Sequence, residues 1–534
     1  MRPRMRRSRG GFGCRSCEHS AGAVGLCANG TIRIAWPRRP NLAILNSPVW
    51  TPWVLAARET HSGAGMAQLL IAGRWTDGIS RQQMLHRFTG QAIDSIPVAG
   101  VAQVTEAVTS AQQAFEASRL TPSDRHRILG RAASLVEERR EDLIALVSAE
   151  TGFPRVDAEN EVNRTVLTLQ LSAEEAHRIV GEMVPLEATP GLTDRIGFTV
   201  LVPLGIVCAI TPFNSPLNVV AHKVAPAIAA GNAVILKPSE HVPLTAVALC
   251  RLLIDAGLPA TMISLVHGGA EIGRALVADP RIAFYAFTGS TRVGKEIQAG
   301  AGLRRTQLEL GSIASTIVCA DADLRAAVAK CVSAGFRKAG QVCTSVQRLY
   351  VQREAATQFT ELLVAATRAL PFGDPSLPDT VVGPMISVEH AKRAESWIGE
   401  ACAAGARVLC GGTRSGAVLA PTVLGDVRPD MKVMCEEIFA PVLCLSVFDG
   451  LQEAIDAANS TPFGLAVGLF TSDLSVALKA GRKLRFGGIH VNEASSARVD
   501  VMPFGGVKDS GFGREGPRYA VREMMEERLL TIRY

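Results

Sequence analysis

From Gly205 onward, short runs of apolar residues alternate with segments of helical periodicity, and this alternation constrains the fold more than any other feature. The run GIVCAI leads into a helical pattern over residues 219–230, and the run that ends at Leu236 leads into a helix ending near Gly257. Two more strand–helix pairs follow, with MISLV and IAFYAF as the strands. Continuous apolar strands joined by helices are typical of a parallel sheet that is covered on both faces. The sequence therefore predicts an α/β fold whose ligand lies at the carboxyl ends of the strands.

Two further segments have clear local patterns. Residues 123–148 carry apolar side chains at helical spacing, with Gly152 beyond the end, and predict one long amphipathic helix. The apolar stretches at residues 183–186 and 196–202 flank the turn-like sequence ATPGLTD, which predicts a β-hairpin. Because this hairpin interrupts the strand–helix alternation, we expect it to form a separate element.

Composition excludes several classes of protein. Of the 534 residues, 47% are hydrophobic and 20% are charged, so the chain is neither a disordered protein nor a small disulfide scaffold. At usual domain sizes this length corresponds to roughly two to four folded units. The apolar stretch Val200–Ile210 contains Pro203 and falls short of the roughly 18 apolar residues needed to cross a bilayer. We therefore expect no membrane partner.

The formal net charge of +6 comes from the N-terminal region. Residues 1–65 contain ten arginines, no lysine and two acidic residues, so they carry +8 and the rest of the chain carries −2. Most of the chain is thus slightly acidic. No basic surface is indicated, and we expect no nucleic acid partner.

Residues 1–65 are rich in Arg, Gly and Pro and show no sustained period of a strand or a helix. We expect a disordered N-terminal extension, or a misassigned start ahead of Met66. The alternative is an Arg-rich organelle-targeting segment, although three glycines within its first 13 residues interrupt the helix that it needs. Cys14 and Cys17 lack the second pair of ligands that a zinc site requires, so no metal is expected. The other cysteines are scattered singly, which suits a reducing compartment, and we expect a cytoplasmic protein.

The segment FTGSTRVGKE, at Phe287–Glu296, is typical of a strand, a glycine turn and a helix start. Amide groups at a helix N-terminus suit a phosphate, Gly289 permits close approach, and Ser290 offers a hydroxyl. The segment nearly matches the phosphate loop of nucleotide hydrolases. However, Glu296 stands where that loop needs a hydroxyl and would repel the phosphate. A turn without a ligand is the other interpretation.

The segment ILKPSE places Lys237 and Glu240 just after a strand. One cation and one carboxylate can together bind the two hydroxyls of a nucleotide ribose. The pair lies at the sheet edge where the ligand is expected. A solvated surface loop is the alternative.

Three residues are candidates for catalysis. Glu309 lies in the apolar segment LELGS. Because an unpaired charge is costly there, its presence indicates a functional role. Cys343 lies in GQVCTS among small polar residues, an accessible setting for a nucleophile. Asn214, in TPFNSPLN after the GIVCAI strand, can donate its amide to an oxyanion. Taken singly, a buried inert cysteine at 343 and a helix cap at 214 are the alternatives.

Together these segments resemble the NAD(P)-dependent aldehyde dehydrogenase superfamily from about Met66 to the C-terminus. The resemblance rests on the order and spacing of the motifs TPFNSP, AGNAVILKPSE, FTGSTRVG, LELGS, GQVCTS, EEIFAPV and MPFGGVKDSGFGREG. It implies an aldehyde-dehydrogenase-like α/β fold. This fold combines a Rossmann-type parallel-sheet cofactor domain, an α/β catalytic domain and a β-hairpin oligomerisation element.

The resemblance also implies a reaction. Cys343 would attack an aldehyde, Asn214 would stabilise the oxyanion, Glu309 would act as the general base, and Lys223 would belong to a proton relay. The aldehyde would become a carboxylic acid through a thiohemiacetal and then a thioester on Cys343. NAD(P)+ would take the hydride.

The residues that the resemblance assigns to the dinucleotide lie in three other motifs. They are Lys237 and Glu240 at the adenosine ribose, Gly289 and Ser290 at the pyrophosphate, and Glu437 with Phe439 at the nicotinamide ribose. Since Glu240 would repel a 2′-phosphate, it favours NAD over NADP.

One motif departs from the family pattern. The usual ELGGKSPNIV reads ELGSIASTIV here, with Ser312 and Ile313 in place of glycine and lysine, which indicates a branch with its own substrate pocket. Arg498 precedes MPFGG, and Arg337 precedes the nucleophile. Cations there would favour an aldehyde that carries a carboxylate, phosphonate or phosphate. For Arg498 a surface or interface position is the alternative.

The resemblance further implies how the chain is divided. Residues 66–182 and 204–311 would form the NAD(P)-binding domain and residues 312–518 the catalytic domain. Residues 183–203 and 519–534 would form the oligomerisation element. An exposed apolar hairpin and an unpaired terminal strand are aggregation hazards in a monomer, so we expect a homodimer or homotetramer.

Three other activities remain open. A coenzyme A-acylating dehydrogenase would pass the thioester to coenzyme A, although the presence of Glu309 favours hydrolysis. A nucleotide hydrolase built on FTGSTRVGKE would require magnesium. A cysteine hydrolase would require a histidine base beside Cys343.

Overall fold

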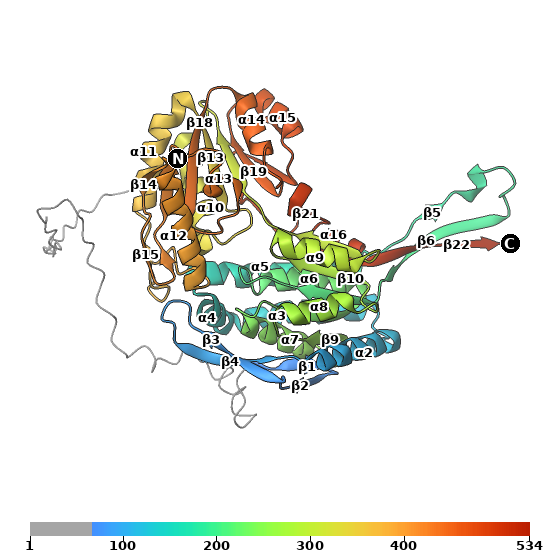
Figure 1. The fold of residues 1–534 in the computed structure, drawn as a ribbon. Helices are drawn as coiled ribbons and strands as arrows, with labels where there is room; N and C mark the ends of the chain where they lie inside the picture. Colours follow the sequence, from blue (N-terminus) through green and yellow to red (C-terminus); the bar gives the residue numbers. More distant parts are fainter. Residues whose placement is uncertain (1–66) are drawn as a thin grey trace, which may run out of the picture. The chain divides into compact units, whose positions relative to one another are not determined.

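The computed structural model describes residues 67–534 (Figure 1). The expectations for residues 1–65, including the targeting alternative and the pair Cys14 and Cys17, fall outside the described residues. Within the described part, two large sheets with helices around them and three small antiparallel sheets form an α/β fold.

The first large sheet contains the predicted strand–helix alternation. In spatial order its strands are β2 (Arg74–Thr76), β1 (Leu69–Ile71), β9 (Ile263–Leu265), β8 (Ala233–Lys237), β7 (Ile206–Ile210), β10 (Phe284–Thr288), β11 (Arg305–Glu309) and β21 (Gly511–Phe512). The strands from β9 to β11 pair in parallel, whereas β1 and β21 pair antiparallel to their neighbours. Every residue of β7 and β8 is buried, as expected for strands that are covered on both faces. The strands predicted from the apolar runs are thus confirmed.

The strand order reverses at β7. The chain moves outward from β7 through β8 to β9, and then returns to place β10 on the other side of β7. In α/β sheets a ligand binds outside the carboxyl ends of the strands at such a switch point. The register sets Lys237 beside Ile210 and Glu309 beside Thr288. The carboxyl ends of β8, β7, β10 and β11 therefore lie along one edge.

Helices cover both faces of this sheet (Figure 1). On one side α6 (Asn218–Ala230) and α7 (Pro243–Asp255) contact α3 (Pro122–Glu138), and α5 (Arg155–Ala176) packs against α6. On the other side α8 (Ala270–Ala278) contacts both α9 (Thr291–Ala301) and α2 (Val101–Ala117). The helices predicted after each apolar run are confirmed.

The single helix predicted over residues 123–148 is wrong. The structure has two helices, α3 and α4 (Arg140–Thr151), which are separated at Arg139, where φ is −107° and ψ is 24°. Apolar side chains on both helices face the same core, so their spacing continues across the break and hides it. Gly152 ends α4 in the left-handed conformation, with φ of 74°, as expected for a C-terminal glycine.

The second large sheet lies in the C-terminal half. In spatial order its strands are β14 (Arg407–Cys410), β17 (Thr422–Gly425), β18 (Val442–Phe448), β13 (Val346–Gln352), β12 (Ala314–Val318), β19 (Ala466–Phe470) and β20 (Gly488–Val491). All neighbours pair in parallel except β14. Its helices are α10 (Leu324–Phe336), α11 (Arg353–Arg368), α12 (Val388–Ala403), α13 (Lys432–Cys435), α14 (Leu451–Asn459) and α15 (Leu474–Lys483). Helix α16 (Pro517–Glu523) returns to pack against α5 and α6.

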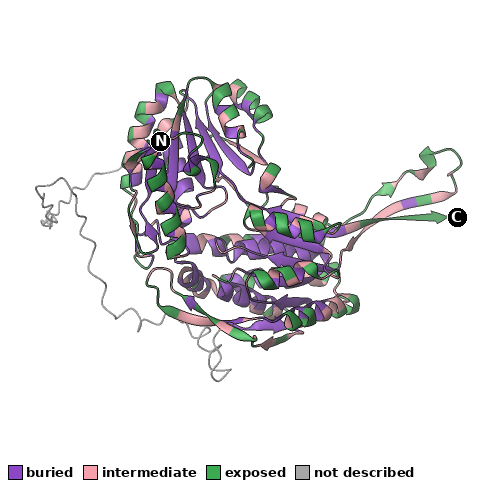
Figure 2. Ribbon diagram, in the orientation of Figure 1, coloured by how far each residue is buried: buried purple, intermediate pink, exposed green. Residues whose placement is uncertain are grey.

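A three-stranded antiparallel sheet joins the middle of the chain to its end. It consists of β22 (Met525–Arg533), β6 (Arg195–Pro203) and β5 (Met183–Val184), and β5 pairs with β6 as the predicted hairpin. The expectation of an unpaired terminal strand is wrong, because β22 pairs antiparallel with β6 along its whole length. Figure 2 shows that β22 is largely exposed while the central strands of both large sheets are buried. Short antiparallel pairs are formed by β3 (Ser80–Leu85) with β4 (Ala92–Val98) and by β15 (Arg414–Ser415) with β16 (Val418–Leu419).

Residues 67–534 contain no helix that combines the length and apolar character needed to cross a membrane. In the same part of the chain, no three His, Cys, Asp or Glu side chains are arranged to hold a metal ion.

Candidate active site

Asn214 lies in the loop between β7 and α6, at the switch point of the first sheet. Helix α6 begins at Asn218 after Leu217, so Asn214 does not cap it. The side chain is buried, and among the described residues its amide has no hydrogen-bond partner. A buried amide without a protein partner can donate to a ligand.

Cys343 lies in the loop that leads into β13. Its thiol is half-buried and free, rather than enclosed in the core. Burial raises the pKa of Cys343 to about 12, Arg498 opposes that rise, and Glu309 adds to it. The resting group is therefore a neutral thiol, which must lose its proton before it can attack a carbonyl.

Glu309 ends β11 and is 2% exposed. Neither carboxylate oxygen has a hydrogen-bond partner among the described residues. Burial, followed by the negative charge of Glu515, raises the pKa of Glu309 well above its usual value. An unpartnered carboxylate with a raised pKa is a stronger proton acceptor than an ordinary carboxylate, which is the property that a general base needs.

Lys223, on α6, contacts Glu515, which is not among the site residues predicted from the sequence. Lys223 Nζ donates to Glu515 Oε1 at 2.9 Å, and Arg498 Nη2 donates to Glu515 Oε2 at 2.7 Å. Burial alone would raise the pKa of Glu515, but the charges of Lys223 and Arg498 outweigh burial and hold it well below its usual range. The sequence did offer a signal for Glu515: it is the acidic residue of the glycine-rich GFGREG, which is part of a motif on which the family resemblance rests.

Several motifs that are far apart in sequence meet around these groups. The rings of Phe213 and Phe439 pack edge to face, with centroids 5.9 Å apart. Glu437 Oε1 accepts a hydrogen bond of 2.9 Å from the backbone N–H of Ser312, three residues after Glu309. Burial raises the pKa of Glu437 to about 7. The structure thus brings EEIFAPV, TPFNSP and LELGS together.

Lys237 and Glu240 both lie against the start of α8. Lys237 ends β8 and is buried, and this burial lowers its pKa. A Cβ atom on Gly269 would lie 3.2 Å from Glu240 Oε2, and one on Gly273 would lie 4.0 Å from Lys237 Cε. Both side chains thus lie near the start of α8, where Lys237 is buried and Glu240 is exposed.

Ser290 is exposed and caps α9, where its hydroxyl accepts from the backbone N–H of Val293 at 3.4 Å. Gly289 precedes it at the end of β10. Lys295 and Glu296 point elsewhere, since Lys295 pairs with Asp509 and Glu296 with Arg292. This arrangement gives no support to a phosphate loop that hydrolyses nucleotides.

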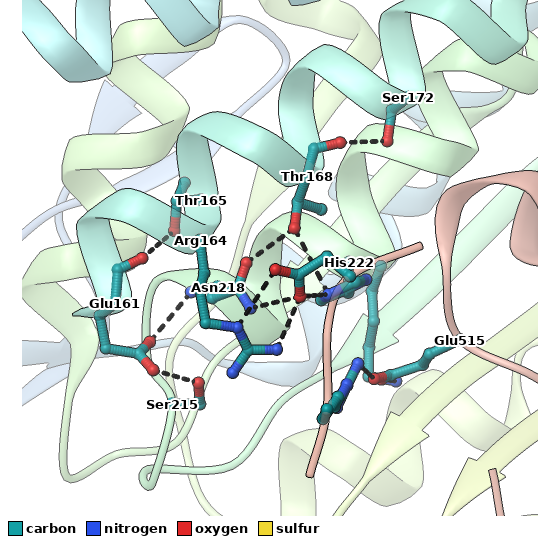
Figure 3. A network of polar contacts seen from close by, with 12 residues as sticks. Glu161, Arg164, Thr165, Thr168, Ser172, Ser215, Asn218, His222 and Glu515 are labelled. Carbon is teal, nitrogen blue, oxygen red and sulfur yellow. Dashed lines mark hydrogen bonds and ion pairs between the residues drawn. The ribbon is translucent and has the colours of Figure 1, made fainter. Parts of the chain in front are cut away.

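A network of polar contacts connects α5, α6 and the loop before MPFGG (Figure 3). Glu161 on α5 accepts from Ser215 Oγ at 2.5 Å. Arg164 Nη2 and His222 Nε2 both bind Asp500 Oδ1, at 2.6 and 2.8 Å. Charged and polar side chains thus line this region next to Asn214.

Arg337 and Arg498 differ in their partners. Arg498 pairs with Glu515 and is 12% exposed, so it is not a surface residue. Arg337 is half-buried and donates to Ser496 Oγ, and among the described residues it makes no ion pair with a carboxylate. Ser496 Oγ also lies 3.0 Å from Thr344 Oγ1, next to Cys343. Both arginines are therefore connected to the surroundings of the thiol.

Comparisons with known proteins agree with this geometry. The chain matches the aldehyde dehydrogenase family over residues 75–530. A 3-sulfolactaldehyde dehydrogenase from Priestia aryabhattai is 44% identical over 465 residues, which are 87% of this chain and 97% of that protein. The crystal structure of aldehyde dehydrogenase 21 from Physcomitrella patens, in complex with the reaction product succinate, gives a TM-score of 0.85 at 36% identity and covers 88% of this chain and 98% of that one.

A third similar structure contains a cofactor. It is a glyceraldehyde-3-phosphate dehydrogenase from Methanocaldococcus jannaschii complexed with NADP, with a TM-score of 0.82 at 37% identity, covering 85% of this chain and 100% of that one. The resemblance and the fold class expected from the sequence are confirmed. The chain belongs to the aldehyde dehydrogenase family, and it is an NAD(P)-dependent oxidoreductase that oxidises an aldehyde to the carboxylic acid.

Proposed function

We propose that Cys343 carries the substrate during this reaction. Its sulfur adds to the aldehyde carbon as a thiolate and forms a thiohemiacetal, whose oxygen is held by the Asn214 amide and the backbone N–H of Cys343. The free amide of Asn214, in a loop where nothing else in the described part binds it, supports this role. Loss of hydride from the thiohemiacetal leaves a thioester on Cys343.

Glu309 then acts as the base that hydrolyses the thioester. It takes a proton from the attacking water, and the acid leaves as the thiol re-forms. Its raised pKa and unpartnered oxygens support this assignment. The charges of Lys223 and Glu515 act on Glu309, and both residues are proposed to belong to its proton relay.

The residues around the sheet edge fit a nicotinamide dinucleotide, which accepts the hydride when bound. Lys237 and Glu240 would hold the adenosine ribose at the start of α8, and Ser290 with Gly289 the pyrophosphate at the start of α9. Glu437 and Phe439 would hold the nicotinamide ribose. The fit is supported by Gly269, because a side chain at this position would crowd the Glu240 carboxylate: its Cβ would lie 3.2 Å from Glu240 Oε2.

We propose NAD rather than NADP as the preferred cofactor, because Glu240 would repel a 2′-phosphate. The matching test is Glu240→Gln, which should lower the KM for NADP relative to that for NAD. An unchanged ratio of the two KM values would remove Glu240 from this role.

The substrate is proposed to be an aldehyde with an anionic group at its far end. The observation that carries this proposal is Arg337, six residues before Cys343, with no carboxylate partner in the described part. Burial lowers the pKa of Arg337, and the charges of Asp157 and Glu161 oppose this only in part. An anionic group on the substrate, paired directly with the guanidinium, would offset the remaining cost of burial. The relatives named for sulfolactaldehyde and crystallised with succinate agree with such a group.

A substrate panel tests this class. We expect succinic semialdehyde or sulfolactaldehyde to be oxidised with a higher kcat/KM than propionaldehyde or benzaldehyde. Arg337→Met should reduce kcat/KM for the anionic aldehydes by roughly 10- to 100-fold, since a hydrogen bond to a charged group contributes about 1.5–3 kcal/mol. Arg353→Met, which breaks an exposed ion pair with Asp449, is the matched control. A clear preference for benzaldehyde would contradict the proposal.

The same assay separates hydrolysis from acyl transfer. With coenzyme A added, a hydrolytic enzyme should release the free acid at an unchanged rate. Accumulation of an acyl-coenzyme A would instead assign the chain to the acylating class. Since among the described residues no histidine is hydrogen-bonded to Cys343, a cysteine hydrolase receives no support.

We propose that residues 66–182 and 204–311 act as the cofactor domain and residues 312–518 as the catalytic domain. Residues 183–203 and 519–534 would join subunits into a homodimer or homotetramer. Exposed apolar side chains on β22 support an interface, because Leu529 and Ile532 are each more than half exposed. Sedimentation equilibrium would show a monomer if this is wrong.

A cytoplasmic location is proposed because the described cysteines are all free thiols.

A further inference from the structure

We propose that Lys338 is a positioning residue, which fixes the oxyanion donor Asn214 relative to the loop of Cys343, and that Glu161 holds Lys338 in place. This inference rests on the proposed role of Asn214. Lys338 lies five residues before Cys343, and neither Lys338 nor Glu161 belongs to the motifs from which the reaction was inferred. Neither side chain is needed at the reacting atoms, so both would act through Asn214.

Lys338 Nζ makes two bonds that join three segments of the chain. It donates to Glu161 Oε1 at 2.6 Å, and it donates to the backbone carbonyl oxygen of Asn214 at 3.0 Å. The side chains of Lys338 and Glu161 are 4% and 0% exposed. In such a water-excluded setting a charged hydrogen bond is strong and its geometry is well defined. The loop of the nucleophile, the loop of the oxyanion donor and α5 are thus linked at one atom.

Glu161 also binds the far side of the Asn214 loop. Its Oε1 accepts from Ser215 Oγ at 2.5 Å, and its Oε2 accepts from the backbone N–H of Asn218 at 3.1 Å (Figure 3). One carboxylate therefore anchors the residue after Asn214 and the first residue of α6. Together with Lys338 Nζ, it binds the loop at the Asn214 carbonyl and at two residues that follow Asn214.

The backbone at Lys338 is in a conformation that needs support. Lys338, Ala339 and Gly340 all have left-handed φ angles, of 52°, 53° and 70°. Two of these residues are not glycine, and such angles persist only where the surroundings enforce them. The backbone N–H of Lys338 donates to Asp157 Oδ2 at 2.9 Å, and Gln341 Nε2 donates to the Lys338 carbonyl at 3.0 Å. The ion pair and these two bonds hold the turn that delivers Cys343.

The physical need for such a link follows from the reaction. An oxyanion donor stabilises the transition state only if it is already placed, within a fraction of an ångström, where the negative charge develops. Asn214 and Cys343 lie on loops 129 residues apart, and each loop follows a different part of the fold. Lys338 belongs to the loop of Cys343, and its buried ammonium binds the backbone of the Asn214 loop. This link limits movement of the two loops relative to each other.

A double-mutant cycle on the full chain tests the inference. The rate of NADH formation in a single turnover would be measured for the wild type, Lys338→Met, Asn214→Ala and the double variant. We expect Lys338→Met to slow hydride transfer by about 10- to 100-fold, as a misplaced catalytic group does, while the KM for NAD stays within about twofold. Asn214→Ala should cost roughly 100- to 1,000-fold. The double variant should be no slower than Asn214→Ala, within about twofold.

Two further variants keep the result interpretable. Glu161→Gln keeps the side-chain volume but loses the charge that holds Lys338, so it should reproduce the loss if Lys338→Met folds poorly. Lys330→Met removes a surface lysine–glutamate pair with Glu493 and should leave the rate unchanged. A residue that only stabilised the fold would lower the Tm and leave hydride transfer intact.

The outcomes separate this inference from the proposed function. If both single variants impair the reaction but their effects multiply in the double variant, Lys338 acts independently of Asn214 and the inference is overturned. An unchanged rate in folded Lys338→Met and Glu161→Gln overturns it as well. If Asn214→Ala alone has no effect, the oxyanion role itself fails, and the inference fails with it.

Discussion

Lys223 Nζ lies 2.9 Å from Glu515 Oε1 in a pair whose side chains are 0% and 1% exposed, although the two residues are 292 positions apart. The charge of Glu515 in turn raises the pKa of Glu309, the proposed general base. The protonation state of Glu309 therefore depends on the charges of the buried pair Lys223 and Glu515.

Replacement of Glu515 by glutamine should shift the pH profile of thioester hydrolysis. The variant removes the negative charge that raises the Glu309 pKa and leaves Lys223 and Arg498, whose charges lower it. Because Glu309 must be a carboxylate, hydrolysis is lost as the pH falls through its pKa. We expect the acid limb to move to lower pH in Glu515→Gln, measured as steady-state turnover against pH. Glu526→Gln, in an exposed pair with Arg305, is the control. An acid limb at the wild-type pH would refute this coupling.

Glu309→Gln should separate acylation from hydrolysis. Hydride transfer does not need this base, so one equivalent of NADH per active site should form in a burst. Turnover should then stall, because the thioester on Cys343 has no base to activate water. Stopped-flow absorbance would show the burst, and intact-protein mass spectrometry would show the acylated chain. Unimpaired steady turnover would assign the base to another residue.

Lys223→Met should destabilise the fold. The substitution leaves the Glu515 carboxylate buried with one partner fewer, and loss of one member of a buried pair costs about 3–5 kcal/mol. The free energy of unfolding, measured in urea, should fall by that order. The matched change Lys295→Met breaks an exposed pair with Asp509 and should cost less than about 1 kcal/mol. An equal loss of unfolding free energy in the two variants would mean that burial does not increase the contribution of the Lys223–Glu515 pair to stability.

Gly340→Ala should displace the loop of Cys343. Gly340 has φ of +70°, and a Cβ there would lie 2.1 Å from the carbonyl oxygen of Ala440, so the backbone must shift. Activity should fall severely, by about 100-fold or more, since a shift of about 1 Å at a reacting group costs that much. Gly416 also has a left-handed φ, of +59°, but open space around its Cβ position. Gly416→Ala should therefore cost only about 1–2 kcal/mol of stability and leave kcat unchanged.

The strand–helix order of the first sheet could be predicted because each element is encoded locally. Strands such as β7 and β8 are buried on both faces, so their sequences are continuous apolar runs. The break at Arg139 could not be found in this way, because the apolar spacing on α3 and α4 continues through it. The family resemblance also pointed to Cys343, Asn214 and Glu309, and their roles stay predictions until the variants are measured.

The sequence by itself determined the fold class, the family and which residues are chemically able to take part, since these depend on runs and motifs of a few residues each. Only the tertiary structure decided which groups meet. Contacts between distant segments decide the partner of Lys223, the bonds of Lys338 to Glu161 and Asn214, and the hydrogen bond of Arg337 to Ser496. No local sequence pattern predicts such contacts. A lysine that will be buried and one that stays in solvent can have similar sequence neighbours, because the carboxylate or carbonyl oxygen that binds the buried one comes from a distant segment.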